Sequence, residues 1–247
     1  MNNANHTQVA IVTGASRGIG AAVARRLAND GFAVVVNYAS SATEADALIA
    51  ELKATGAQAI AVKADVSKAD DVRRMFETSE QQLGKVDVLV NNAGVLKTVP
   101  LADTSDALFD QTVDINLRGT FNTLREAAAR LNDGGRIVNF SSTTLALNMP
   151  GYAVYNATKA AVEAFTHVFA KELRGRNITV NAVAPVPIAT SLFLDGKTEE
   201  QIQTFAKMPP LQRLGQPDDI ASVVSFLAGP DAAWVNGQIL RANGGIA

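Results

Sequence analysis

Short apolar runs alternate with longer segments of helical periodicity along nearly the whole chain, and this alternation constrains the fold more than any other feature. The runs are almost continuously apolar, which is typical of strands that helices cover on both faces of a parallel sheet. Strands are predicted at residues 9–13, 33–38, 58–64, 86–91, 135–141, 178–184 and 238–242, and helices at residues 18–30, 42–55, 68–84, 105–131, 153–175, 199–207 and 217–228.

Strand and helix follow each other without an intervening linker, repeat or low-complexity segment. This pattern predicts the α/β class, with one doubly wound domain over residues 1–247 and a mostly parallel seven-stranded sheet between helices. The least regular stretch, residues 185–215, contains four prolines, two glycines and one short amphipathic helix. Loops of this length usually bind a ligand or cover a site, so residues 186–215 are the candidate substrate loop.

Composition excludes several function classes. Twenty-two Lys and Arg against 24 Asp and Glu give a net charge of −2, which leaves no electrostatic footprint for nucleic acid or an anionic membrane. The chain has no cysteine, and its two histidines, His6 and His167, are too few for a zinc site, so no metal is expected. No apolar run approaches the ~20 residues that span a bilayer, and the polar start MNNANHTQ is unlike a secretory signal. The expected location is cytoplasmic.

A glycine-rich turn, TGASRGIG at residues 13–20, follows the first predicted strand and opens directly into a helix. Its glycines Gly14, Gly18 and Gly20 follow a GxxxGxG spacing rather than the commoner GxGxxG. Glycine lets the backbone approach a phosphate closely, and the helix N-terminus stabilises the phosphate charge. The turn therefore predicts a phosphate site, with a glycine-rich turn that binds no ligand as the alternative.

The chain resembles the short-chain dehydrogenase/reductase family, in the branch of about 250 residues that includes 3-oxoacyl-[acyl-carrier-protein] reductases and carbonyl reductases. The resemblance extends from residue 9 to residue 245 and is carried by several separated motifs in the family's order. Besides the glycine turn these are Asp65-Val66, NNAG at 91–94, NAVAP at 181–185 and VNGQILRANGG at 235–245. It implies a Rossmann-like fold that binds a nicotinamide dinucleotide. The implied cofactor contacts are Gly14, Ser16, Arg17, Gly18, Ile19, Gly20, Asn37, Tyr38, Ala39, Ser40, Asp65, Val66, Asn92, Ala93, Gly94, Tyr155, Lys159, Pro185, Ile188 and Thr190.

The end of the second strand bears on the choice between NADP(H) and NAD(H). An acidic residue there binds the ribose 2′-hydroxyl of NAD(H) and repels a 2′-phosphate. This chain has Asn37, Tyr38, Ala39 and Ser40, with no carboxylate. Arg17 in the glycine turn is suited to pair with a 2′-phosphate, with a solvated loop position as the alternative. The sequence therefore predicts NADP(H), and use of NAD(H) stays open.

The segment YNATK places Tyr155 and Lys159 four residues apart, on one face of a predicted helix. A neighbouring ammonium is expected to lower the pKa of the Tyr155 phenol. With Ser142, 13 residues upstream of Tyr155, and Asn116, these residues match the family's catalytic set. The resemblance implies a reversible hydride transfer in which Tyr155 donates the proton, Ser142 holds the carbonyl oxygen, and Lys159 contacts the nicotinamide ribose. Asn116 is implied to hold a water; a buried residue at a helix kink is the alternative, and it does not exclude this role.

One position departs from the family. Where the family has Pro-Gly after the sixth strand, this chain has Pro185-Val186-Pro187, and valine lacks ready access to positive φ. The start of the substrate loop is therefore expected to be repositioned, and the pocket reshaped. Predicted substrate contacts are Ser142, Leu145, Leu147, Tyr152, Tyr155, Val186, Leu192, Phe193 and Phe205, with Met208 closing over them.

Three functions compete. The first is an NADPH-dependent carbonyl reductase of a small-molecule ketone, aldehyde or alcohol. The second is a 3-oxoacyl-[acyl-carrier-protein] reductase, which needs a basic docking surface. Arg176 matches one basic position of that surface, whereas Asp133 places a negative charge at the other. The third is a nucleotide-binding regulator without catalysis, which the intact set of Asn116, Ser142, Tyr155 and Lys159 disfavours. The family resemblance also implies a homotetramer.

Overall fold

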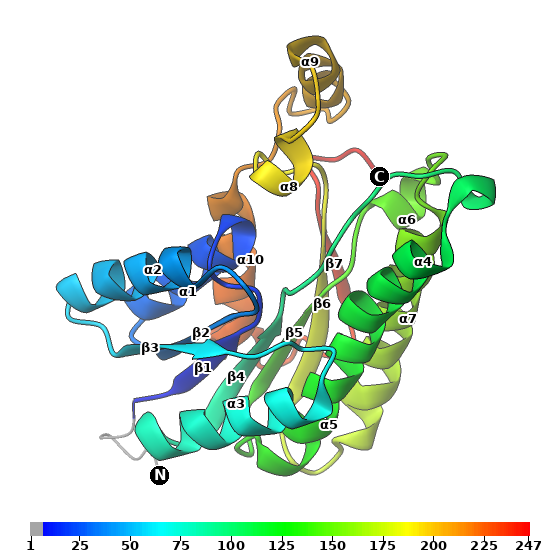
Figure 1. Cartoon of the computed structure of the whole chain (residues 1–247). Helices are drawn as coiled ribbons and strands as arrows, with labels where there is room; N and C mark the ends of the chain where they lie inside the picture. Colours follow the sequence, from blue (N-terminus) through cyan, green and yellow to red (C-terminus); the bar gives the residue numbers. More distant parts are fainter. Residues whose placement is uncertain (1–6) are drawn as a thin grey trace.

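The computed structural model describes residues 7–247, so His6 and the start of the N-terminal segment considered above lie outside the described residues. Seven parallel strands form one sheet in the order β3-β2-β1-β4-β5-β6-β7 (Figure 1). This sheet confirms the predicted α/β class, and the two halves of the sheet run outward from a reversal between β1 and β4. The strands are β1 (Val9–Val12), β2 (Ala33–Tyr38), β3 (Ala59–Lys63), β4 (Val86–Asn91), β5 (Arg136–Phe140), β6 (Thr179–Pro185) and β7 (Ile239–Ala242).

Helices cover both faces of the sheet (Figure 1). One face packs against α1 (Gly18–Asn29), α2 (Ala42–Ala54) and α10 (Pro217–Ala228), and the other against α3 (Ala69–Gln82), α5 (Gly119–Arg130) and α7 (Ala153–Glu172). The shorter elements are α4 (Asp106–Thr112), α6 (Thr144–Leu147), α8 (Ser191–Leu194), α9 (Glu199–Lys207) and the 3₁₀ turns Leu101–Asp103 and Pro230–Ala232. Among the helices of the described chain, none is both long and apolar enough to cross a membrane.

Alternate residues of each central strand enter two different cores. In β1, Ala10 and Val12 belong to the cluster under α1 and α10, whereas Val9 and Ile11 belong to the cluster under α3 and α5. All four side chains are fully buried. Burying a side chain of Val or Ile size stabilises the fold by about 1.5–3 kcal/mol. Because both faces are covered, both sets of side chains are apolar, and this explains the continuous apolar runs in the sequence.

The single helix predicted over residues 105–131 is wrong in detail. The chain forms α4, then a π-helical turn at Val113–Arg118, and then α5. A π turn inserts an extra residue without changing which residue types are apolar, so the periodicity gave no sign of it. The turn carries Asn116, which is buried. It therefore determines where this side chain enters the site.

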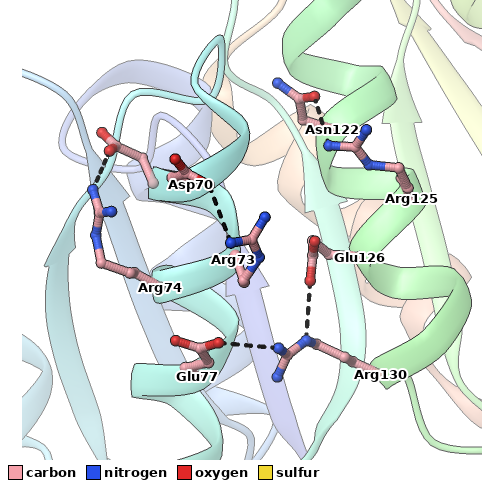
Figure 2. A network of polar contacts seen from close by, with 9 residues as sticks. Asp70, Arg73, Arg74, Glu77, Asn122, Arg125, Glu126 and Arg130 are labelled. Atoms are coloured by element: carbon pink, nitrogen blue, oxygen red, sulfur yellow. Dashed lines mark hydrogen bonds and ion pairs between the residues drawn. The ribbon is translucent and has the colours of Figure 1, made fainter.

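Helix α5 is joined to α3 by an ion-pair network centred on Arg130 (Figure 2). Its guanidinium pairs with Glu126 at 3.0 Å on its own helix, and with Glu77 at 3.2 Å and Glu80 at 2.9 Å on α3. An isolated surface pair contributes about 0–1 kcal/mol, but three carboxylates around one half-buried arginine form a network. The network holds the C-terminal end of α5 against α3.

The reversal of strand order between β1 and β4 locates the site. From β1 the chain proceeds outward through β2 and β3 and then crosses to β4, on the opposite side of β1. The loops after β1 and β4 therefore diverge, and a crevice opens at the carboxyl ends of these strands. In Figure 1, α8 and α9 lie beyond the end of β6, at the same edge of the sheet.

Candidate active site

At two of its glycines, the turn after β1 is packed too tightly to admit a side chain. Gly14 has φ +60°, and a Cβ there would lie 2.9 Å from Cα of Ala93. A Cβ on Gly20 would lie 2.5 Å from Nδ2 of Asn92 and 2.5 Å from the carbonyl oxygen of Gly14. The Asn92 amide donates to the carbonyls of Thr13 at 2.9 Å and Gly14 at 3.0 Å. The end of β4 thus holds the turn in place, and glycine is required at both positions.

The N-terminus of α1 is open toward this turn. Arg17, the residue before the helix, has an extended backbone with φ −153°, and its side chain makes no capping hydrogen bond. The first N–H groups of a helix have no partner within the helix and favour an anion. A cleft runs over this N-terminus and extends to the ends of β2 and β4. It is lined by Gly14, Ser16, Arg17, Gly18, Ile19, Gly20, Asn37, Tyr38, Ala39, Ser40, Ser41, Ala64, Asp65, Val66, Asn92, Ala93, Gly94, Val95, Gln111, Ile115, Thr190, Ser191 and Leu192.

Two predicted cofactor contacts use their polar groups within the protein. The Asn37 amide accepts from the N–H of Gly14 at 3.1 Å and donates to the carbonyls of Val62 and Ala64. The Asp65 carboxylate accepts from the N–H and the hydroxyl of Ser67. The Asn37 amide thus shapes the cleft wall, whereas both bonds of the Asp65 carboxylate fall on Oδ1 and leave Oδ2 as an acceptor. Tyr38, Ala39, Ser40 and the exposed Arg17 also line this cleft.

A second cleft adjoins the first at the ends of β4, β5 and β6. The two clefts share Ile19, Asn92, Gly94, Val95, Thr190 and Leu192, so they are parts of one crevice. The structure brings Ser142, Tyr155 and Lys159 together here, along with Pro185 and Ile188. The remaining lining residues are Leu96, Phe140, Ser141, Thr144, Tyr152, Val186, Pro187 and Phe193.

Ser142 and Tyr155 form the polar end of this second cleft, where hydrogen bonding by Ser142 acts to lower the pKa of the Tyr155 phenol. The neighbouring Ser141 donates to Glu163 on α7 at 2.6 Å, which leaves Ser142 as the serine hydroxyl beside Tyr155. Lys159, one helical turn after Tyr155, lies with Nζ 5.7 Å from the centroid of the tyrosine ring. This arrangement is able to hold an oxygen atom and exchange a proton with it.

The pKa values of Tyr155 and Lys159 differ from the expectation drawn from the sequence. Burial raises the pKa of Tyr155 to about 12, instead of the expected decrease. Burial also lowers the pKa of Lys159 to about 8, and its Nζ donates to the carbonyl of Phe140 at 2.7 Å. Desolvation therefore outweighs the attraction between ammonium and phenolate in this structure, because both groups leave water together.

Asn116 lies behind the cleft and lines neither part of it. Its Oδ1 accepts from the N–H of Val95 at 2.8 Å, and its Nδ2 donates to the carbonyl of Val95 at 2.9 Å and to Thr158 at 3.3 Å. A Cβ on Gly94 would lie 3.3 Å from Oδ1 of Asn116. By this geometry Asn116 is a positioning residue for the loop after β4, which matches the alternative of a buried residue at a helix irregularity.

The predicted substrate residues separate into two groups. Ser142, Tyr152, Tyr155, Val186, Leu192 and Phe193 line the second cleft, whereas Leu145, Leu147 and Phe205 do not. Leu145 and Leu147 follow Thr144 in the short helix α6, and only Thr144 of that helix faces the cleft. Phe205 on α9 packs edge-to-face against Phe193, with ring centroids 5.2 Å apart, so it supports the wall from behind.

Val186 adopts no strained backbone. It is absent from the described residues with positive φ, and its side chain is 9% exposed and packs in the core with Ile188. Pro185 accepts a hydrogen bond from the N–H of Thr143 at 2.9 Å. The valine side chain therefore forms part of the cleft wall.

Two polar residues near the catalytic group were missed from the sequence. Thr144 lies two residues after Ser142, and Asn156 follows Tyr155 directly. The structure joins them by two hydrogen bonds. Their only sequence signal is their position beside two motif residues.

The two residues weighed for a basic docking surface neutralise each other. Nε of Arg176 pairs with Asp133 at 2.8 Å, and its other nitrogens donate to the carbonyls of Ala128 and Leu131. The guanidinium of Arg176 is therefore fully used in hydrogen bonds within the chain.

Comparisons with known proteins agree with this geometry. A family model described as enoyl-(acyl carrier protein) reductase matches residues 14–247. A short-chain type dehydrogenase/reductase of Picea abies is 45% identical, with 96% of this chain and 92% of the relative covered. An NADPH-dependent aldehyde reductase-like protein of Arabidopsis thaliana is 44% identical (96% and 93% covered). A 3-oxoacyl-[acyl-carrier-protein] reductase of Staphylococcus aureus is 42% identical (97% and 98% covered).

Solved structures match the whole fold. A short-chain dehydrogenase/reductase of Serratia marcescens superposes with a TM-score of 0.92 at 36% identity, with 98% of each chain covered. A metagenomic blue fluorescent protein in complex with NADPH gives a TM-score of 0.92 at 40% identity, again with 98% of each chain covered. A short-chain dehydrogenase of Burkholderia cenocepacia in complex with NADP gives 0.92 at 36% identity, with 99% of each chain covered.

Proposed function

Since this chain belongs to the short-chain dehydrogenase/reductase family, we propose that it is an NADPH-dependent carbonyl reductase of small ketones and aldehydes. As a member of this family, the chain is an oxidoreductase that acts on CH–OH and C=O groups. The proposal of a carbonyl reductase rests on one observation. Ser142, Tyr155 and Lys159 line a mostly apolar cleft that continues into the glycine cradle. A carbonyl oxygen beside Ser142 and Tyr155 would thus face a cofactor held by the cradle.

The residues of the chain account for each requirement of carbonyl reduction. When bound, NADPH supplies the hydride that the carbonyl carbon receives. Tyr155 donates the proton to the carbonyl oxygen, and its raised pKa keeps it protonated at neutral pH. Ser142 holds the same oxygen by a hydrogen bond. Lys159, beside the Tyr155 ring, is placed to contact the nicotinamide ribose. Asn116 keeps the loop at Val95 in position.

The cofactor is NADP(H), as the sequence predicts. In the relatives, an NADPH-dependent reductase-like protein and complexes with NADPH and NADP support it. In this chain, the exposed Arg17 lines the same cleft as residues 37–40, and none of these four residues carries a carboxylate. A guanidinium at this place favours a 2′-phosphate through a charge-assisted hydrogen bond.

The cleft walls favour a substrate with apolar substituents. Tyr152, Val186, Leu192 and Phe193 surround the polar end formed by Ser142 and Tyr155. An apolar cleft with one polar end suits a ketone or aldehyde bearing hydrophobic groups. The proposal includes residues 186–215 as the substrate loop of a single NADP(H)-binding domain over the whole chain, because the start of this segment, including Val186, Leu192 and Phe193, lines the cleft.

A homotetramer is part of the proposal. Phe109 on α4, Phe121 on α5 and Val168 on α7 are large apolar side chains that are 44–53% exposed. Such residues on neighbouring helices are typical of a surface that another copy covers. Size-exclusion chromatography with light scattering measures the assembly directly, and a monomeric mass would contradict it.

Reduction of a carrier-bound 3-oxoacyl thioester is the second candidate. It is supported by the 42% identity to the Staphylococcus aureus reductase. It is disfavoured by the Arg176–Asp133 pair, because an acidic carrier needs free positive charge beside the site.

The test follows consumption of NADPH, with NADH in parallel, across aryl ketones, ketoesters, aldehydes and a 3-oxoacyl thioester. The proposal expects turnover of simple carbonyls with NADPH, weak turnover of the thioester, and a loss of about 10²-fold or more in Tyr155→Phe. Tyr152→Phe is the matched control, because its ring lies 6.4 Å from that of Tyr155 without the lysine partner. A preference for the thioester would favour the second candidate, and binding of NADPH without any turnover would favour a regulator.

A further inference from the structure

The loop after β3 forms one wall of the first cleft. Asp65 and Val66 line this cleft but not the second one, which contains Tyr155 and Lys159. The two loop residues therefore face the half of a bound dinucleotide that is remote from the hydride. Because the nicotinamide carries the hydride, this remote half is the adenosine half. A wall of two loop residues keeps its shape only if neighbouring elements hold it.

Two side chains from outside the loop bond to its backbone. On α3, Oδ2 of Asp71 accepts from the N–H of Asp65 at 3.0 Å. On α5, Nδ2 of Asn122 donates to the carbonyl of Val66 at 2.9 Å. Asn122 is 3% exposed, so this bond is shielded from water. The two bonds thus join successive residues of the wall to two different helices.

The Val66 side chain also packs against the backbone of α5. A Cβ added to Gly119, the first residue of α5, would lie 2.6 Å from Cγ2 of Val66. No side chain therefore fits between the loop and the helix, and the position of α5 determines that of Val66. Figure 2 shows Arg125 beside the amide of Asn122, with Nη2 3.5 Å from Oδ1. This contact agrees with an amide whose nitrogen faces the Val66 carbonyl.

We propose that Asp71 and Asn122 are positioning residues for the adenosine half of the cofactor, because they hold the wall formed by Asp65 and Val66 in place before the cofactor binds. The inference rests on the proposed function, since it takes the first cleft as the cofactor site. A loop that is already ordered loses less conformational entropy on binding, so this order raises the affinity. Neither Asp71 nor Asn122 lines a part of the crevice, so both act through the loop.

Asp71 has two further roles that an experiment must separate from this one. Its Oδ1 pairs with Arg74 on the surface of α3, and a carboxylate in the first turn of a helix favours the helix through its dipole. Asp71→Ala removes all three contributions. Asp71→Asn removes the charge but retains an amide oxygen that can accept from the N–H of Asp65. The difference between these two variants therefore isolates the hydrogen bond to the loop.

Titration calorimetry with two fragments of the adenosine half tests the inference without turnover. The probes are adenosine 2′,5′-bisphosphate and adenosine 5′-diphosphate. Asp71→Ala and Asn122→Ala are each expected to weaken the binding of both probes about five- to tenfold, since each variant removes one hydrogen bond from the wall. Asp71→Asn is expected to bind both probes within about twofold of the parent. Thermal unfolding verifies that each variant is folded at the temperature of the titration.

Each alanine variant has a matched control. Asp70→Ala removes the neighbouring carboxylate of α3, which pairs with Arg73 at 3.1 Å on the surface. Thr123→Val removes a buried hydroxyl of α5 that donates to the carbonyls of Gly119 and Thr120 in its own helix. Both controls are expected to bind the two probes like the parent, even where they lower the unfolding temperature.

Steady-state kinetics with a carbonyl substrate give a second readout. Asp71→Ala and Asn122→Ala are expected to raise the KM for NADPH by the factor measured with the probes. The kcat is expected to stay within about twofold of the parent, because the interaction that is lost contributes equally to the ground state and the transition state. If no carbonyl is turned over, the proposed function fails, while the probe affinities still decide the inference.

Unchanged probe affinity in either alanine variant would overturn the inference. Equal losses in Asp71→Ala and Asp71→Asn would do the same, because the charge rather than the hydrogen bond would then matter. A parent protein that binds neither probe would also contradict it, since the wall would not hold an adenosine half. If Asn122→Ala fails to fold, Asp71→Ala and Asp71→Asn decide, because the Asp71 side chain is 29% exposed and its truncation leaves no buried cavity.

Discussion

The side chain of Asn116 is joined to the backbone of Val95 by two hydrogen bonds, one accepted by Oδ1 at 2.8 Å and one donated by Nδ2 at 2.9 Å. Val95 lies on the wall shared by both parts of the crevice. The pair therefore connects the π turn before α5 to the loop after β4. In this way, a local irregularity of one helix determines the position of a cleft wall.

Asn116→Ala is expected to lower both stability and activity. The variant leaves the N–H and the carbonyl of Val95 without their partner, which costs about 1–3 kcal/mol of the free energy of unfolding. Displacement of the cleft loop is expected to lower kcat/KM about tenfold. Urea unfolding and steady-state kinetics measure the two effects. Asn132→Ala, which loses contacts to Lys85 and Asp87 away from the crevice, serves as the control and should retain its activity. Equal activity losses in both variants would contradict a specific role for Asn116.

Gly20→Ala is expected to weaken NADPH binding by about tenfold or more. The added Cβ would lie 2.5 Å from both the Asn92 amide and the Gly14 carbonyl, so the cradle must open. Overpacking of this kind also costs about 1–3 kcal/mol of stability. Titration calorimetry with NADPH measures the affinity. In the control Gly56→Ala the new Cβ meets nothing within 4 Å, so only backbone strain at φ +86° is added and the affinity should not change. Normal binding by Gly20→Ala would show that the cradle does not hold the phosphates.

Arg17→Ala is expected to reduce the preference for NADPH over NADH by about tenfold, since a charge-assisted hydrogen bond contributes about 1.5–3 kcal/mol. The ratio of kcat/KM for the two cofactors is the measurement. Arg25→Ala, on the helix that follows Arg17, is a matched control, because Arg25 pairs with Glu51 at 2.7 Å and does not line the cleft. A parallel loss with both cofactors in Arg17→Ala would mean that this arginine does not distinguish the 2′-phosphate.

Lys159 is expected to make the stability depend on pH. Burial lowers its pKa in the folded chain to about 8 from the ordinary 10.5. Between these values the unfolded chain binds more protons, so the free energy of unfolding decreases as the pH falls from 10.5 to 8 and then becomes constant. Lys159→Met removes this contribution. Measured by urea unfolding between pH 8 and 10, below the region in which Tyr155 contributes, the stability of the variant relative to the parent should rise by at least about 1 kcal/mol as the pH falls.

The control for this titration is Lys171→Met, an exposed position on the same helix. Its stability difference from the parent should stay constant across the same pH range. If the Lys159→Met difference were also constant, the ammonium would not be desolvated as the structure indicates.

Much of the architecture was predictable because it depends on local patterns. The buried strands of a parallel sheet require continuous apolar runs, and the expected positions agree with β1 to β7 within about two residues at most boundaries. The glycine turn and the spacing of Tyr155 and Lys159 were likewise visible, because an approach of backbone to phosphate and a shared helix face are properties of nearby residues. The π turn at Val113–Arg118 was not, since it changes the backbone hydrogen bonds without changing the apolar pattern.

Contacts between distant segments depended on the tertiary structure. The sequence by itself determined the strands, the cradle glycines and the identities of Ser142, Tyr155 and Lys159. It gave no indication that Asn37 would accept a hydrogen bond from Gly14 or that Arg176 would form an ion pair with Asp133. Nor did it indicate the hydrogen bond between Thr144 and Asn156. Nor did it show that burial would raise the pKa of Tyr155. The partners of a hydrogen bond and the water excluded from a side chain are set by elements far apart in the sequence, so only the folded chain decides them.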